Sequence, residues 1–132
     1  MVSNAERIAK ARWIRKRLGG GMRQAGILAA AGQHALTHHI GRLGEDHERA
    51  RRLAEALAEF DVVDAARVRT NIVPLDLSRS ALDAPSLGVT AREAGVMVSV
   101  LGPRVARLVT HMDVDDAGID TAIDVLTGIF KR

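Results

Sequence analysis

The chain has 132 residues, of which 47% are hydrophobic and 27% charged, with a formal net charge of +3. This composition is that of an ordinary globular protein with one modest core, and the lack of cysteine excludes disulfide bonds and thiolate metal sites. No apolar run approaches the ~18–20 residues that cross a bilayer, so we expect a cytoplasmic protein without a membrane partner.

The first predicted element is a basic helix over residues 5–18, in which Ile8, Ala11, Ile14 and Leu18 form one apolar stripe. Residues 1–24 contain seven basic groups and one acid, whereas the other 108 residues contain 12 basic and 15 acidic groups. A positive block on an acidic body favours an anionic partner. A solvated basic helix face is an equally good interpretation.

Three glycines at residues 19–21 end this helix, and a second helix is predicted over residues 22–40. Glycines before a helix N-terminus expose backbone N–H groups to an anion, and Arg23 adds a donor fork suited to phosphate. A flexible turn that happens to precede an arginine explains the same residues. His34 and His38 have the i,i+4 spacing of zinc ligands, but no third ligand accompanies them, so we predict no metal site.

A break at residues 41–44 precedes a third helix over residues 45–60, with ion pairs predicted between Glu45 and Arg49 and between Glu48 and Arg52. The apolar period then changes. Residues 70–77 form a predicted strand, which Pro74 assigns to an edge or a bulge. Further along, we predict a helix over residues 86–94, a more buried strand over residues 96–101 and a strand over residues 105–111. Asp113 or Asp115 caps a last helix that ends near Phe130.

The short turn at residues 102–104 requires the last two strands to pair antiparallel. We therefore predict an α/β fold in the broad, α+β-like sense. Helices pack on one face of a small, mainly antiparallel three-stranded sheet, and a long helical segment precedes it.

Arg107 is the second candidate for anion binding. On a strand, Arg107, Val109 and His111 point to one face, and Ala106, Leu108 and Thr110 to the other. An arginine among apolar neighbours needs a partner. A bound carboxylate is one such partner, and an internal pair with Asp113 or Asp115 is the alternative.

Several segments together resemble the low-specificity L-threonine aldolases. They are RWIRKRLGGGMRQAGILAAAG at residues 12–32, RLGEDHERARRLAEAL at 42–57, TNIV at 70–73, GVMVS at 95–99 and RLVTHMDV at 107–114. The resemblance covers nearly the whole chain. It implies a pyridoxal-phosphate enzyme of the aspartate-aminotransferase-like fold type I, which cleaves threonine or allo-threonine to glycine and acetaldehyde, usually as a homotetramer.

The resemblance also implies roles for individual residues. Arg107 matches the arginine that binds the substrate α-carboxylate, Arg23 matches a residue beside the cofactor phosphate, and Lys16 matches a basic residue near the active site. Residues 1–41 would correspond to the end of the large domain and the interdomain helix, and residues 42–132 to the C-terminal small domain.

One family feature has no match here. The family's Schiff-base lysine lies in a Ser-Lys-Gly-Leu-Gly-like run, and none of Lys10, Lys16 and Lys131 has that context. We therefore expect no catalytic residue, no covalently bound pyridoxal phosphate and no activity from this chain alone. The amino-acid substrate would bind only after a large domain completes the site.

Two alternatives remain. In the first alternative, the chain is a non-catalytic interaction module that forms a homo-oligomer or binds a complementing N-terminal half. A nucleic-acid binder, whose affinity would fall steeply with salt, is a weaker possibility. With aromatic residues at 2% of the chain there are almost no stacking platforms, so we expect no nucleic-acid partner.

Overall fold

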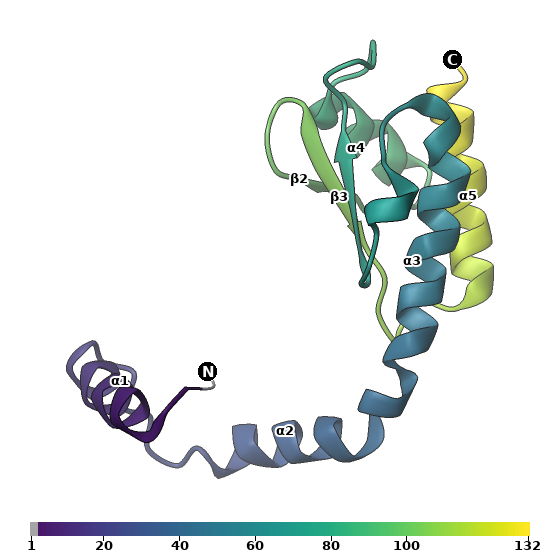
Figure 1. Cartoon of the computed structure of the whole chain (residues 1–132). Coiled ribbons are helices and arrows are strands. Elements are labelled where there is room, and N and C mark those ends of the chain that lie inside the picture. Colours follow the sequence, from purple (N-terminus) through teal and green to yellow (C-terminus); the bar gives the residue numbers. More distant parts are fainter. Residues whose placement is uncertain (1–2) are drawn as a thin grey trace. The chain divides into compact units, whose positions relative to one another are not determined.

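The computed structural model describes residues 3–132, which divide into two compact units, one ending at Ile40 and one spanning Gly41–Arg132. The first unit contains helices α1 (Ala5–Arg17) and α2 (Gly26–His38) (Figure 1). Asn4 caps α1 by accepting a hydrogen bond from the Arg7 backbone N–H at 2.9 Å. Neither helix contains a buried residue, so the apolar stripe predicted for the first helix has no core beneath it in this unit.

The break predicted at residues 41–44 is present but lies earlier, between the end of α2 at His38 and the start of the next helix at Leu43. A short 3-10 turn, Ile40–Arg42, leads directly into helix α3 (Leu43–Leu57), which includes Gly44. Glycine costs about 1 kcal/mol in a helix interior, but Gly44 lies in the first turn. Glu45 and Asp46 in that turn interact favourably with the helix dipole.

The sheet of the second unit has three antiparallel strands in the order β1-β3-β2. They are β1 (Ile72–Asp76), β2 (Ser99–Val100) and β3 (Val105–Val109). Pro74 therefore lies on an edge strand, as predicted. Thr110 donates its backbone N–H to the Asn71 carbonyl at 3.0 Å. The odd-numbered residues of β1 therefore direct their backbone N–H and C=O groups toward β3. The missing N–H of Pro74 falls on the outer edge, where it removes no ladder bond.

Strand β2 is shorter and more exposed than predicted. Residues 96–101 were expected to form a buried strand, but only Ser99 and Val100 pair with β3, and both are exposed. The cause lies at the end of the preceding helix. Gly95 has φ +86°, and the Val96 N–H returns to the Ala91 carbonyl at 2.8 Å. This C-terminal cap directs Val96 and Val98 toward the core and away from β3.

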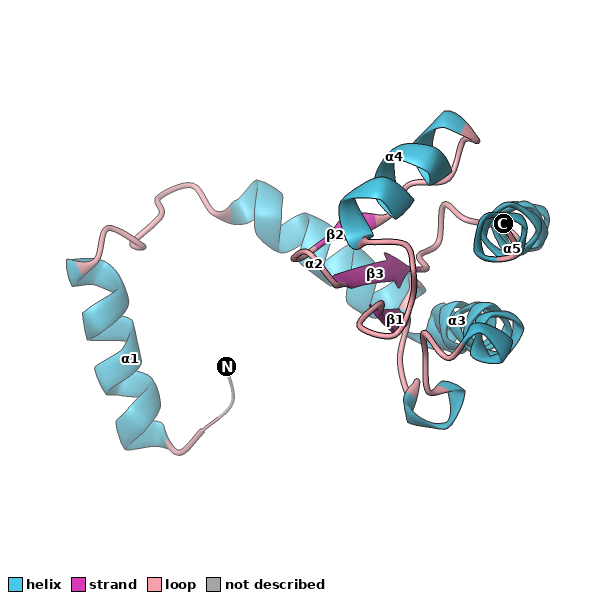
Figure 2. Ribbon diagram, turned by 90° about the horizontal axis from the view of Figure 1, so that it is seen from above, coloured by secondary structure: helices cyan, strands magenta, loops and turns pink. Residues whose placement is uncertain are grey.

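Helices α3, α4 (Ala84–Glu93) and α5 (Asp116–Phe130) pack on one face of the sheet (Figure 2). The strands β1 and β3 both alternate between exposed and buried positions, which is the pattern of a sheet covered on one side. The fully buried side chains include Leu57, Leu75, Leu77, Leu87, Ile119 and Leu126. The fold class predicted from the sequence is therefore confirmed.

Two arginines of α3 connect it to α5. Arg49 donates to the Asp116 carboxylate at 2.9 Å, and Arg52 pairs with Asp120. The predicted pair between Glu45 and Arg49 is present at 3.9 Å. Glu48, which was predicted to pair with Arg52, instead pairs with Arg51, because the guanidinium of Arg52 reaches the neighbouring helix.

Substitution of Leu57 tests how much the core between sheet and helices contributes to stability. Leu57→Ala removes a fully buried side chain and should lower the free energy of unfolding by about 2–5 kcal/mol, measured by urea denaturation. Leu101→Ala is the control, because Leu101 is 57% exposed; it should change stability by much less. Equal losses for the two variants would contradict this description of the core.

The titration of Asp83 should make the free energy of unfolding depend on pH in acid. This residue caps α4, and its pKa lies below the ordinary value because Ser86 hydrogen-bonds its carboxylate through side chain and backbone. The stabilisation is therefore complete above the unfolded pKa of about 3.9 and is lost as pH falls through the lower folded-state pKa. Asp83→Asn keeps a cap without a titrating group, so its unfolding free energy should fall less steeply below about pH 4. Identical slopes would refute this role.

Candidate functional site

The open face of the sheet presents one charged group in its centre. Arg107 is the middle residue of β3, which is itself the middle strand, and its side chain lies on the exposed side. Its two neighbours along the strand, Ala106 and Leu108, point to the other face and are buried. The predicted division of this strand into two faces is therefore confirmed.

A short row of residues crosses the sheet at this point. Arg107 lies opposite Pro74 on β1 and Ser99 on β2. Ile72, Val105 and Val109 are the apolar residues of the same face, and each is between 40% and 45% exposed. The same face also carries Asp76 at the end of β1, whose carboxylate accepts hydrogen bonds from Ser78, so apolar side chains and one engaged acid share this face with the arginine.

The internal partners suggested for Arg107 are engaged elsewhere. Asp113 lies 3.5 Å from the His111 Nδ1 atom, and Asp115 caps α5 by accepting the Gly118 N–H at 2.8 Å. The alternative of an internal pair with Asp113 or Asp115 is therefore wrong. Within the described part of the chain, no carboxylate forms an ion pair with Arg107.

The first unit has its own cationic groups. After α1, Gly19 has φ +79°, and the Gly20 N–H donates to the Arg15 carbonyl at 2.8 Å. The backbone of Gly21 then passes close to Lys16. A Cβ at Gly21 would lie 2.5 Å from the Lys16 Cδ and 3.1 Å from its Nζ, atoms at the far end of a flexible, exposed side chain that can move aside. The result is an exposed ammonium beside a loop of small residues.

Arg23 lies in the same loop but not at a helix N-terminus. The helix predicted from residue 22 begins at Gly26, because Gln24 adopts φ +48° and interrupts the helical path. Arg23 is exposed on the bend before it. The idea that residues 19–24 lead straight into a helix N-terminus is therefore wrong. Lys16 and Arg23 share the first unit, and Arg107 belongs to the second.

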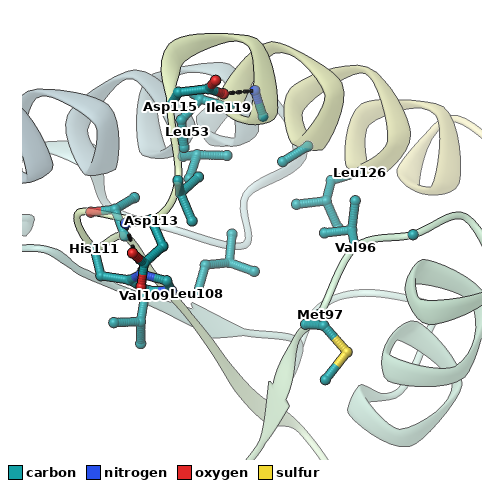
Figure 3. Close-up of a pocket in the computed structure, with 15 residues that line it drawn as sticks. Leu53, Val96, Met97, Leu108, Val109, His111, Asp113, Asp115, Ile119 and Leu126 are labelled. Atoms are coloured by element: carbon teal, nitrogen blue, oxygen red, sulfur yellow. Dashed lines mark hydrogen bonds and ion pairs between the residues drawn. The ribbon is translucent and has the colours of Figure 1, made fainter.

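A cavity of about 450 Å³ lies between the end of β3, α5 and the segment after α4 (Figure 3). Leu108, Ile119 and Leu126 line its inside, and the His111–Asp113 pair lies on one side. The buried hydroxyl of Thr110 already donates to the Asp46 carbonyl at 2.6 Å. The sequence did not predict this cavity, because it arises where residues 96–98 leave β3.

Fold and site together define the second unit as a small α/β domain with one open sheet face that carries an exposed arginine. Comparison with known proteins identifies its family. Residues 1–80 match the family of beta-eliminating lyases, and the chain belongs to this family.

Individual relatives agree with this assignment. A low specificity L-threonine aldolase of Escherichia coli O157:H7 is 42% identical over 115 residues, which cover 86% of this chain and 33% of the relative. A probable low-specificity L-threonine aldolase 2 of Arabidopsis thaliana is 35% identical over 98% of this chain and 38% of its own length. Alanine racemase TOXG of Cochliobolus carbonum is 32% identical over 94% of this chain.

The chain spans about a third of the length of the curated relatives it matches. No helix in residues 3–132 is long and apolar enough to cross a membrane. The family resemblance noted from the sequence is therefore confirmed, and the roles of Arg107, Arg23 and Lys16 stay predictions.

Proposed function

We propose that this chain forms the anion-binding part of a pyridoxal-phosphate-dependent lyase of the threonine aldolase type, with cleavage of threonine or allo-threonine to glycine and acetaldehyde as the reaction of the completed enzyme. The observation that carries the proposal is Arg107, an exposed guanidinium in the centre of an open sheet face with no carboxylate partner in the described residues.

In this proposal Arg107 binds the α-carboxylate of the amino acid. A guanidinium offers two parallel N–H donors, which match the two oxygens of a carboxylate and set the orientation of the substrate. The apolar neighbours Ile72 and Val109 exclude water from one side of that ion pair and thereby strengthen it.

Lys16 and Arg23 bind the phosphate of the cofactor. One observation fits this group: the segment from residue 7 to residue 44 contains no acid that would compete for these cations. When bound, the cofactor supplies the electron sink for carbon–carbon cleavage. The residues of this chain hold and orient the two anions.

Carboxylate binding is supported by the variety of the relatives. The names of two of them refer to threonine and one to alanine, and the α-carboxylate is common to both amino acids. The chain alone is proposed to be inactive, because none of Lys10, Lys16 and Lys131 lies in the family's lysine run. A covalently attached cofactor requires such an amine.

A chimera tests the proposal. This chain should replace the matched third of the Escherichia coli relative, and the chimera is expected to release acetaldehyde from threonine, whereas the isolated chain with pyridoxal phosphate should not. Arg107→Ala in the chimera should lower kcat/KM for threonine about 100-fold or more, because a charged hydrogen-bonded partner is lost. Arg107→Lys, which keeps the charge but loses the fork, should fall in between.

Arg92→Ala is the matched control, because Arg92 is an exposed arginine of α4; its kcat/KM should stay within about twofold of the unmodified chimera. An active chimera that tolerates Arg107→Ala would refute the role of Arg107. Robust turnover by the isolated chain would refute the proposal that it is inactive alone.

Association is a second candidate function, supported by the first unit. Ile27 is 84% exposed, Leu28 61% and Leu36 64%, and an apolar surface of this kind favours a protein partner. We propose that this unit binds a second copy or a complementing N-terminal half of the enzyme. Light scattering after size-exclusion chromatography should show an oligomer, and Leu28→Glu with Leu36→Glu should weaken it. A monomer at about 100 μM would argue against self-association.

A further inference from the structure

Helix α2 carries a cluster of histidines that the proposed function does not use. The rings of His34 and His38 have centroids 4.4 Å apart, and the ring of His39 lies 5.3 Å from that of His34. His34 and His38 are both exposed. They are four positions apart on the helix, so both side chains lie on one face.

The surroundings of this pair supply neither a charged partner nor a hydrogen-bonding partner for the imidazoles. Residues 25–40 contain no charged Asp, Glu, Lys or Arg side chain. Helical spacing puts Ile27 and Ala31 on the same face as the two histidines. The polar contacts of this helix, between Gln33 and Thr37, involve other residues. Two imidazoles are thus held together on an otherwise apolar surface.

We propose that His34 and His38 form a two-histidine site for a divalent transition-metal ion of the Ni²⁺, Cu²⁺ or Zn²⁺ type. Imidazole nitrogen is a preferred ligand of these ions, and they bind it at about 2.0–2.1 Å. Ring centroids 4.4 Å apart let both rings turn a nitrogen toward one ion. The absence of a third ligand, which argued against a metal in the sequence, is compatible with a bidentate site.

Water completes the coordination sphere. In the described residues no group of three or more His, Cys, Asp or Glu could hold a metal ion, so His39 is a neighbour rather than a ligand. The seven basic groups of residues 1–24 oppose the approach of a cation. The site therefore depends on direct bonds from nitrogen to metal rather than on charge. Metal binding would stabilise α2, because both ligands lie on it.

The test is a calorimetric titration of the full chain with NiCl₂ in a buffer that does not coordinate metal. One ion per chain is expected. His34→Gln and His38→Gln should each weaken binding about tenfold or more, since loss of a partner in a metal site has at least this effect. Nickel should also broaden the ring-proton resonances of His34 and His38 before those of the other histidines.

Two matched controls separate this site from general histidine affinity. His39→Gln changes the adjacent histidine, and His47→Gln changes an exposed histidine of α3; each should alter the affinity less than threefold. Glutamine suits an exposed helix position, and circular dichroism will confirm folding. Unchanged binding in His34→Gln or His38→Gln, equal losses in His39→Gln, or no binding by the unmodified chain would overturn the proposal.

Discussion

Alternation along β3 is the constraint on which the rest of the second unit depends. Ala106, Leu108 and Thr110 face the helices and are buried, so the residues between them must face outward. A slip of one residue in the pairing with β1 would reverse both sets. It would place Arg107 in the core at a large desolvation cost and expose Leu108. The same packing that stabilises the fold thus directs the guanidinium to the open face.

The helices that cover the sheet also engage several carboxylates in ion pairs and caps. Asp116 and Asp120 hold α3 against α5, and Asp83 and Asp115 cap helices. These acids are committed to the fold by interactions with defined geometry. Arg107 therefore keeps its hydrogen-bonding capacity for a ligand. Asp76, the one acid of β1 itself, accepts hydrogen bonds from the N–H and hydroxyl of Ser78.

The sequence predicted the elements better than their limits. Three features were predictable from local rules: an edge or bulge position for Pro74 from its missing donor, the two faces of β3 from a period of two, and a helix cap at Asp113 or Asp115, which the structure places at Asp115. These rules need no knowledge of distant contacts. The confirmed part of the fold consists mainly of such features.

The predictions were wrong where a backbone angle sets the limit of an element or where a residue distant in sequence supplies the ion-pair partner. Residues 22–25 fit a helical pattern, but φ at Gln24 is positive. Residues 96–98 fit a strand, but the cap at Gly95 diverts them. Arg52 fits an i,i+4 pair, but a carboxylate 68 residues away pairs with it. The cavity beside β3 follows from the second of these deviations, so it could not be predicted either.

The choice of cation at each position agrees with the geometry around it. Arg107 lies on the central strand between Pro74 and Ser99, where the planar fork of its guanidinium suits a planar carboxylate. Lys16 lies at the end of a helix beside a glycine loop. There a compact ammonium on a flexible stem can follow a tetrahedral phosphate without a fixed orientation. Within the proposed function, the guanidinium of Arg107 suits a carboxylate, and the phosphate would meet both the ammonium of Lys16 and the guanidinium of Arg23.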